Sequence, residues 1–319
     1  LIKRKYYMRA VRHSAEGIEV VQVPDVAPNL ESEIISVRSA SICGSDLHLL
    51  QFGALPFTLG HEFAGITSTG RAVAIDPNVP CGTCDQCRGS ASNRCRTATN
   101  RILGIGADGG MADSISVRKS ALIDLPASLR LEDACLVEPL GVATHGMRQA
   151  QLVGGERIGV VGAGSIGLAA VAAARPLASE VGLAARHEHQ QAAGERLGAK
   201  VAQGEYDVVI ECAGTSSALE RATEMCRPGG LVLFLSTLWD SVPIPGFTAM
   251  AKELGFRWSF TYGEHEHGTD LKDSAQLLSD NPEIAETLIT HRFGIDEARE
   301  AFRVASDRKS GSIKVVIEP

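Results

Sequence analysis

The sequence has no excess of basic residues, because 31 Lys and Arg are outnumbered by 38 Asp and Glu, which gives a formal net charge of −7. Domains that bind nucleic acid usually present a basic surface, so this balance argues against a nucleic-acid partner. The sequence also lacks internal repeats and low-complexity tracts. No apolar run is extended by apolar flanks to the roughly 20 residues of a membrane span, so we expect no membrane partner.

No segment joins a basic start to an apolar stretch in the way that a signal peptide does. We therefore expect a reducing, cytoplasmic setting, in which disulfides are rare. Residues 1–7 precede Met8 and are rich in lysine, so we interpret them as an extension or a solvated tail. A length of 319 residues with 44% hydrophobic content predicts two domains, each with its own core.

Four of the eight cysteines form a tight array. Cys81, Cys84, Cys87 and Cys95 are separated by two, two and seven residues. Four thiolates close a tetrahedron around Zn²⁺ and leave no position for a substrate, so the array predicts a structural zinc site. Glycine, proline, serine and asparagine within residues 80–95 argue against a helix or strand and favour a lobe held by the metal. Paired disulfides and a nucleic-acid zinc ribbon are the alternatives. The lack of a signal-peptide pattern disfavours disulfides, and the lack of a basic excess disfavours a nucleic-acid ribbon.

A second set of metal-binding residue types precedes this array. Cys43 offers a thiolate and His61 an imidazole, and a carboxylate comes from Glu62 or from the later Glu138. Three protein ligands leave a fourth position for water or a substrate oxygen, which is the arrangement of a catalytic zinc. Such a zinc is a Lewis acid and lowers the pKa of a bound hydroxyl from about 15.7 to about 7. Standing alone, Cys43 would be interpreted as a buried thiol and His61 as a core histidine.

Three polar residues close to Cys43 complete the predicted catalytic set. Asp46 is placed to orient the imidazole of His61 as a carboxylate behind the metal ligand. Ser45 and His48 are placed to carry the released proton outward.

Residues 157–174 have the pattern of a nucleotide-binding turn between a strand and a helix. Residues 157–161 are expected to form a short buried strand, and residues 168–174 an alanine-rich helix. Between them, Gly162-Ala163-Gly164-Ser165-Ile166-Gly167 matches the dinucleotide fingerprint. Its first glycine allows the turn, its second lets the backbone approach the pyrophosphate, and its third lets the helix pack on the strand. A further strand is expected at residues 206–212, so the fold class is α/β with a doubly wound parallel sheet.

The next strand predicts which dinucleotide is bound. Residues 180–184 are expected to form that strand, and Ala185-Arg186-His187 follow it. An NAD-dependent enzyme of this fold places Asp or Glu here to bind the ribose 2′-hydroxyl, whereas an arginine suits a 2′-phosphate. No acid stands at this position, so we predict that Arg186, with a contribution from His187, selects NADP(H). The alternative is that Arg186 is a solvated charge and that Glu188 reaches the ribose.

These motifs together resemble the zinc-dependent medium-chain alcohol and polyol dehydrogenases. The resemblance covers nearly the whole chain from Met8 onward and rests on Cys43-Gly44-Ser45-Asp46-Leu47-His48, on Gly60-His61-Glu62-Phe63-Ala64-Gly65 and on the cysteine array. It implies that Cys43 and His61 bind a catalytic zinc and that the cysteine array binds a structural one. It also implies that Ser45 and His48 form the proton relay.

The segment Val137-Glu138-Pro139-Leu140-Gly141 resembles the sorbitol, threonine and sugar dehydrogenase branch of that family. In this branch a glutamate stands where simple alcohol dehydrogenases have a third zinc-binding cysteine, so Glu138 becomes a ligand candidate beside Glu62. A carboxylate before Pro139 is also favoured at a helix start by the helix dipole alone, and both interpretations can hold together.

The resemblance implies a mostly β GroES-like catalytic domain formed by both chain ends, residues 1–144 and 260–319, with the zinc lobe at 81–95. A Rossmann domain, residues 145–259, would lie between them, and a homodimer or homotetramer is expected. Three further elements are predicted: a hairpin at 8–22, a helix at 296–305 and a final strand at 313–317.

Residues 66–75 depart from the family pattern, because they are much shorter than the corresponding stretch. A trimmed loop beside the zinc would widen access for the substrate or reduce contact between domains. An apolar substrate pocket is expected from four residues that would otherwise belong to the core: Leu49, Phe52, Leu55 and Phe57. Two histidine pairs, His187 with His189 and His265 with His267, resemble metal tags, but exposed pairs of this spacing more often bind adventitious ions.

The sequence thus predicts a zinc-dependent oxidoreductase that transfers a hydride between an alcohol and a ketone or aldehyde, with NADP(H) as the preferred cofactor. One alternative is a zinc-independent NADPH quinone or alkene reductase, which would need neither Cys43 and His61 nor the cysteine array. Another is a non-catalytic NADPH-binding sensor, which would keep the glycine turn without any turnover of alcohols.

Overall fold

The computed structural model describes residues 7–27, 29–97, 101–307 and 309–319, so the expected extension at residues 1–7 lies outside the described part except for Tyr7, which begins a strand. The chain forms two compact units. Unit 1 comprises Leu1–Glu138, Gly263–Asp280 and Ile289–Pro319, and unit 2 comprises Pro139–Tyr262 and Asn281–Leu288. Among the described residues, no helix combines the length and the apolar character that crossing a bilayer requires.

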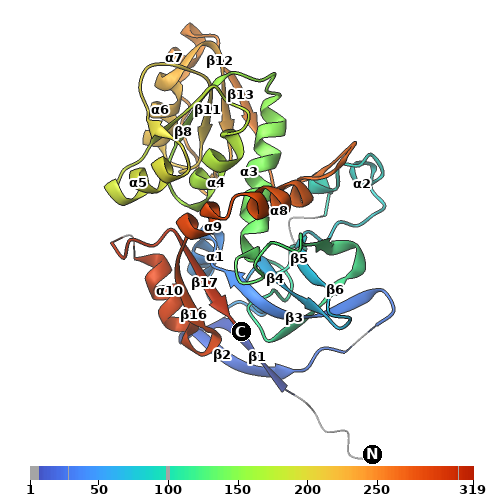
Figure 1. The fold of residues 1–319 in the computed structure, drawn as a ribbon. Helices are drawn as coiled ribbons and strands as arrows, with labels where there is room; N and C mark the ends of the chain where they lie inside the picture. Colours follow the sequence, from blue (N-terminus) through green and yellow to red (C-terminus); the bar gives the residue numbers. More distant parts are fainter. Residues whose placement is uncertain (1–6, 28, 98–100, 308) are drawn as a thin grey trace, which may run out of the picture. The chain divides into compact units, whose positions relative to one another are not determined.

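Unit 1 is built on a seven-stranded sheet that contains strands from both ends of the chain. Its order is β16-β17-β3-β4-β5-β7, and β6 also pairs with β3. The strands are β3 Ser32–Ser41, β4 Glu62–Thr67, β5 Ala72–Ile75, β6 Ser114–Arg118, β7 Leu122–Asp124, β16 Ile289–Gly294 and β17 Lys314–Glu318. Because β17 pairs in parallel with β16 and antiparallel with β3, it joins the two chain ends, as the red and blue strands of Figure 1 show.

The core of unit 1 follows from the alternation of apolar residues along these strands. In β6, for example, Ile115 and Val117 are buried while their neighbours are only partly so. The helix α10, Ala298–Ser306, covers this core with Ala298, Ala301 and Phe302, which share one face at spacings of three and four residues. The predicted C-terminal helix and final strand are therefore present, each within two residues of the expected bounds.

A separate hairpin and several short elements complete unit 1. The hairpin predicted at the N-terminal end is confirmed as β1 Tyr7–Ser14 and β2 Gly17–Pro24, with Gly17 at a φ of 103° in the turn. The shortened stretch at residues 66–75 comprises the end of β4, a tight turn at residues 68–71 and the whole of β5, which pairs antiparallel with β4. Besides short 3-10 turns, the described part of unit 1 also contains α1 Gly44–Leu49, α2 Asp85–Arg88, β14 Glu264–His265, β15 Gly268–Thr269 and α8 Asp270–Asp280.

Unit 2 contains the doubly wound parallel sheet that the sequence predicts. Its six strands run in the order β10-β9-β8-β11-β12-β13, and all neighbours are parallel. They are β8 Arg157–Val161, β9 Glu180–Ala184, β10 Lys200–Val201, β11 Tyr206–Glu211, β12 Cys226–Phe234 and β13 Gly255–Trp258. The strand expected at residues 180–184 is confirmed. β12 includes Arg227-Pro228-Gly229-Gly230, and its pairing with β11 has a register shift there.

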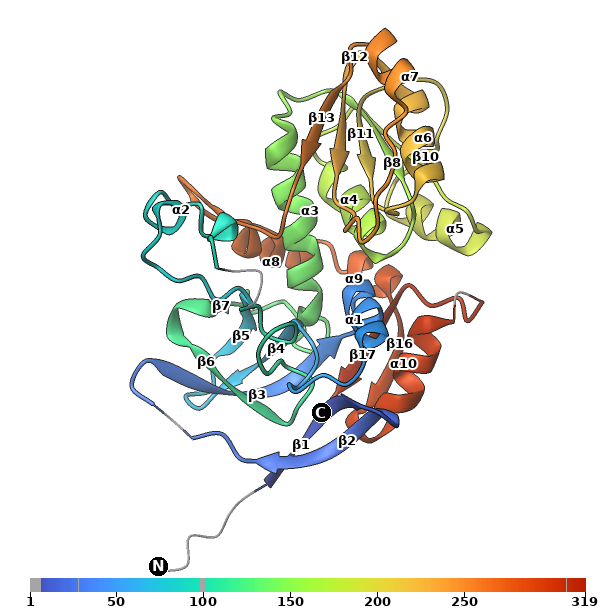
Figure 2. The same ribbon diagram turned by 180° about the vertical axis from the view of Figure 1, so that it is seen from behind.

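The helices of unit 2 follow the strands in chain order, as a buried parallel sheet requires. They are α3 Val137–Ala150, which begins in unit 1, α4 Ser165–Ala174, α5 Glu188–Arg196, α6 Ser216–Met225, α7 Gly246–Ala251 and α9 Glu283–Leu288. Figure 2 shows the strands between α3 on one side and α6 with α7 on the other. The chain leaves β8 toward β9 and β10 in one direction, and continues from β11 toward β13 in the other. The sheet therefore has its topological switch point between β8 and β11.

Candidate active site

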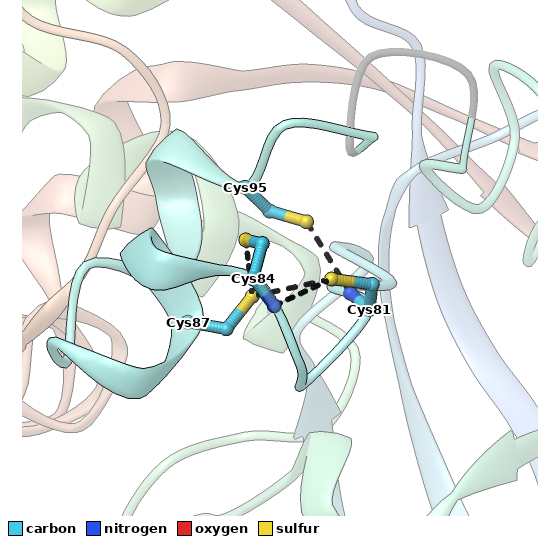
Figure 3. A group of neighbouring side chains, drawn as sticks. All are labelled: Cys81, Cys84, Cys87 and Cys95. Carbon is cyan, nitrogen blue, oxygen red and sulfur yellow. Dashed lines mark hydrogen bonds between the residues drawn. The ribbon is translucent and has the colours of Figure 1, made fainter.

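The four cysteines expected to hold a structural zinc come together in one lobe of unit 1, with their sulfur atoms pointing toward one another (Figure 3). The four sulfurs lie within 4.8 Å of one another. Cys87 Sγ lies 3.5 Å from Cys84 Sγ and 3.9 Å from Cys81 Sγ. Zinc with four Zn–S bonds of about 2.3 Å separates its sulfurs by about 3.8 Å, so the lobe fits this ion.

The expectation that the cysteine array contains no helix is wrong. The helix α2 forms one turn that begins directly after Cys84 and contains Cys87. Asp85 lies in that turn, where a carboxylate is favoured by the helix dipole, and it binds the Arg96 guanidinium at 2.6 Å. Because Cys84 and Cys87 are three residues apart across this turn, both thiols face the same side and can reach one ion.

The second predicted metal set also comes together in unit 1. Cys43 precedes α1 as its N-cap, His61 directly precedes β4, and Glu62 begins that strand. One ligand atom from each lies within 4.8 Å of the other two. His61 and Glu62 are buried, and Cys43 is half-buried. A sulfur, a nitrogen and a carboxylate oxygen at this separation fit a zinc ion with a position left for another ligand.

Asp46 and Ser45 contact the two sides of the His61 ring. Asp46 is fully buried, accepts the backbone N–H of Cys43 at 2.8 Å, and places its other oxygen 3.4 Å from His61 Nδ1. Ser45 Oγ lies 3.3 Å from His61 Nε2. Burial lowers the pKa of His61, but the charges of Asp46 and Cys43 outweigh this effect and hold the pKa well above its usual value. With Nδ1 facing a carboxylate, Nε2 is the ring nitrogen available to a metal.

Sequence reasoning missed the residue that holds Glu62. Lys314, in β17, is 1% exposed, and its Nζ donates to both carboxylate oxygens of Glu62 at 2.7 and 2.9 Å. The Ser41 hydroxyl donates to the same carboxylate. Burial alone would lower the pKa of Lys314, but the charges of Glu62 and Cys43 raise it above its ordinary value. A lone charge inside the apolar run Ile313-Lys314-Val315-Val316-Ile317 was the available signal, because a buried lysine requires an anionic partner.

Glu138 lies in the first turn of α3 with Pro139 beside it, as the helix-start interpretation predicts. Its side chain is buried, and its charge contributes to the raised pKa of Lys314. The described cluster within 4.8 Å nevertheless consists of Cys43, His61 and Glu62. The geometry therefore brings Glu62 nearest to the predicted ligands, and Glu138 remains a candidate close to the same lysine.

The glycine turn of unit 2 has the shape that a dinucleotide requires. Gly162 has a φ of 96°, and a Cβ there would lie 2.9 Å from Ala213 Cβ. A Cβ on Gly167 would lie 1.8 Å from the Gly162 oxygen, so only glycine lets α4 pack this closely. A Cβ on Gly164 would meet nothing within 4 Å, which leaves open space beside the helix N-terminus for a pyrophosphate.

Arg186 is exposed two residues beyond the end of β9, the strand that pairs with β8. His187 is the N-cap of α5, and its ring stacks on that of His189 at 5.6 Å. Glu188 is the first residue of this helix and is exposed.

Comparison with known proteins agrees with this geometry. Residues 31–127 match the model of the alcohol dehydrogenase GroES-like domain, and residues 160–279 match that of the zinc-binding dehydrogenases. A protein of Emericella nidulans named "Probable D-xylulose reductase A" is 30% identical over 350 aligned positions, which cover 95% of this chain and 94% of the relative. The chain is a zinc-binding medium-chain dehydrogenase.

Two further relatives of this dehydrogenase cover nearly its full length. Sorbitol dehydrogenase of Bacillus subtilis is 28% identical over 97% of this chain and 96% of its own. The crystal structure of a protein described as a zinc-binding dehydrogenase of Sinorhizobium meliloti 1021, bound to NADP, is 30% identical. It superposes with a TM-score of 0.87 over 99% of this chain and 100% of that one. The predicted combination of a GroES-like domain built from both chain ends with a parallel Rossmann sheet is confirmed.

The residues predicted for the substrate pocket and one of the two histidine pairs have surroundings that do not define a binding site. Leu55 and Phe57 pack against the core of unit 1, whereas Phe52 is 70% exposed with its ring edge-on to that of His48. His265 Nε2 lies 3.1 Å from an Asp273 oxygen, while its Nδ1 accepts the backbone N–H of His267. A ring that accepts at Nδ1 carries its proton at Nε2 when neutral, so it suits a pair with Asp273 better than a metal.

Proposed function

We propose that the protein catalyses reversible hydride transfer between the carbinol carbon of an alcohol and C4 of the nicotinamide of NADP(H). The observation that carries the proposal is the assembly of Cys43, His61 and Glu62 in one cluster, in a chain whose other unit has a dinucleotide turn. This cluster argues against a zinc-independent reductase, which would have no use for it, and against a sensor that needs only the nucleotide.

The residues that would hold the catalytic zinc are Cys43, His61 and one of the carboxylates Glu62 and Glu138. When bound, zinc would supply Lewis acidity, which makes a hydroxyl more acidic and polarises a carbonyl. Asp46 fixes the His61 ring from the Nδ1 side, so that Nε2 keeps its direction. The carboxylate of Glu62 is held in turn by Lys314.

Ser45 and His48 would move the proton that an alcohol loses. They lie three residues apart on α1, so their side chains share one side of the helix. The Ser45 hydroxyl reaches the Nε2 side of His61, where the substrate oxygen is expected. His48 is half-buried beside the exposed Phe52 ring, so it is suited to exchange the proton with solvent.

The preference for NADP(H) is supported by Arg186 and by the absence of an acid directly after β9. A guanidinium binds a 2′-phosphate with two parallel hydrogen bonds. The residues directly after β9 also include no carboxylate, which would repel the phosphate. The Sinorhizobium relative, at 30% identity, is a complex with NADP.

Cofactor constants test this preference. Arg186→Ala should raise the KM for NADP at least tenfold and leave that for NAD nearly unchanged. Arg196→Ala, at the exposed C-terminal end of α5, is the matched control and should alter neither KM. A wild type that binds NAD more tightly than NADP would refute the preference.

Metal analysis tests the catalytic zinc. The wild type should contain two zinc ions per chain, and Cys43→Ala should contain one, keep its fold and lose turnover. Cys226→Ala changes a buried cysteine away from both clusters and should keep two zinc ions and full activity. Full activity in Cys43→Ala would overturn the proposed chemistry.

We propose a secondary alcohol or polyol as the substrate, because the relatives include a sorbitol dehydrogenase and a protein named as a xylulose reductase. A panel of polyols and simple secondary alcohols with NADP at alkaline pH would identify it.

A homodimer or homotetramer remains part of this proposal. Among the described strands of unit 2, β13 forms an edge of the sheet, and Trp258 and Phe260 beside it are 57% and 51% exposed. An open edge with exposed aromatic side chains is suited to association. Light scattering should show a mass of at least two chains, and Trp258→Glu should reduce it.

A further inference from the structure

Glu211 is the last residue of β11, at the point where the strand order of unit 2 reverses. Its partner across the sheet is Val161, the last residue of β8, which leads directly into the glycine turn. In sheets of this kind, ligands bind outside the carboxyl ends of the strands at the switch point. Glu211 therefore lies beneath the place where the dinucleotide is expected.

The Glu211 carboxylate is fully buried and holds two loops at this edge. One oxygen accepts the backbone N–H groups of Ala213 at 2.7 Å and Gly214 at 2.8 Å, in the loop after β11. The other oxygen accepts the hydroxyl of Ser236, in the loop after β12. A single side chain thus fixes both segments that continue from the strands on one side of the switch point.

The first of these loops touches the glycine turn. A Cβ on Gly162 would lie 2.9 Å from Ala213 Cβ, so Ala213 forms the wall against which the turn rests. On the other side, a Cβ on Gly214 would lie 3.1 Å from the Thr237 oxygen, so the two loops are also in close contact. A shift of the loop after β11 would therefore move the turn that approaches the pyrophosphate.

These contacts also distinguish Glu211 from an acid that binds ribose. Its two oxygens already accept three hydrogen bonds from the protein, and it is 0% exposed. A carboxylate that recognises a 2′-hydroxyl must present a free oxygen to the ligand.

We propose that Glu211 is a positioning residue for the nicotinamide cofactor: it fixes the loops after β11 and β12 and thereby the glycine turn that receives the pyrophosphate. The inference rests on the proposed binding of a nicotinamide dinucleotide, but not on whether NADP or NAD is preferred. It assigns a role in cofactor affinity to a residue that does not contact the cofactor.

The test compares cofactor affinity in three variants of the full-length, zinc-loaded protein. Glu211→Met removes both acceptors at similar volume, leaves the N–H groups of Ala213 and Gly214 without their acceptor, and should raise the Kd for NADPH and for NADH at least tenfold. Glu211→Gln keeps an oxygen for the two N–H groups, and its amide can donate to the Ser236 oxygen, so its Kd should stay within about threefold of the wild type.

Glu156→Met is the matched control. Glu156 accepts the N–H groups of Val153 and Gly154 at 2.7 and 2.9 Å in the same unit. It directly precedes β8, so it lies at the amino ends of the strands and Glu211 at their carboxyl ends. Glu156 is only half-buried, so Glu156→Met should lose less thermal stability than Glu211→Met, and it should keep its cofactor affinity. Zinc content should remain two in all variants, because both cysteine-containing clusters lie in unit 1.

A Kd of folded Glu211→Met within twofold of the wild type, or an equal loss in Glu156→Met, overturns the inference. If Glu211→Met does not fold, Glu211→Asp decides, because its shorter side chain cannot reach both loops. A several-fold higher Kd then supports the inference, and an unchanged Kd overturns it. A wild type that binds neither NADPH nor NADH refutes the proposed function itself, and the inference with it.

Discussion

The buried pair of Lys314 and Glu62 gives the sharpest prediction for stability. Lys314 is 1% exposed and Glu62 0%, so Lys314→Met in protein without zinc at Cys43 and His61 would leave a carboxylate in the core, and among the described residues the Ser41 hydroxyl would be its one remaining side-chain donor. Removing one partner of a buried ion pair costs about 3–5 kcal/mol. We expect the free energy of unfolding of unit 1 to fall by this amount.

The double variant Lys314→Met with Glu62→Gln should recover most of the loss, because neither charge then remains buried. The matched control is Lys200→Met, which breaks a pair with Glu180 of similar length, 3.0 Å, but with the lysine 73% exposed. Exposed pairs contribute about 0–1 kcal/mol, so this variant should differ little from the wild type.

Urea unfolding would measure these effects unit by unit. Both tryptophans of the chain, Trp239 and Trp258, lie in unit 2, so tryptophan fluorescence follows that unit and should not change. Far-ultraviolet circular dichroism includes the transition of unit 1, which should move to lower urea in Lys314→Met. A loss below about 1 kcal/mol, or a double variant no more stable than the single one, would refute the reasoning about a buried charge.

Two further predictions concern unit 1. Cys84→Ser should remove one zinc ion per chain and lower the thermal stability of the zinc lobe, since a hydroxyl is a poor zinc ligand, and elemental analysis with two zinc ions still bound would contradict this. Burial raises the pKa of Asp76 from its ordinary value of 3.8 to about 6, so its contribution to stability is present at low pH and is lost as the pH rises through about 6. The stability of Asp76→Asn relative to the wild type should therefore increase by roughly 1 kcal/mol between about pH 5.5 and 7.5, and urea titrations that show no such increase would contradict the raised pKa.

The parts of the site that could be predicted depend on residues close together in sequence. The spacing of Cys81, Cys84 and Cys87 fits one ion because a single turn separates the ligands, and the glycine turn and its flanking elements are equally local. Even there, the one-turn helix α2 was missed, because glycine and serine around it outweigh its own four residues in any pattern.

The parts that could not be predicted depend on pairings across the chain. Glu62 and Lys314 are 252 residues apart, and they meet because β3 pairs with both β4 and β17. Glu211 was interpreted only as part of a strand, since its hydrogen bonds to Ala213 and Ser236 depend on how two loops end at the same edge. Sequence patterns predict the strands, but they do not predict which buried acid fixes neighbouring loops through hydrogen bonds.

The position of β17 between β16 and β3 has a consequence for biosynthesis. During translation Glu62, next to His61, emerges 252 residues before Lys314. Unit 2 can close its sheet while the ribosome is still at work, since its strands span only residues 157–258. Unit 1 cannot complete its sheet until the last strand is made, and until then the Glu62 carboxylate stays in water. In a nascent chain stalled before residue 314, proteases should therefore cleave the N-terminal segment of unit 1 and leave the folded sheet of unit 2 intact.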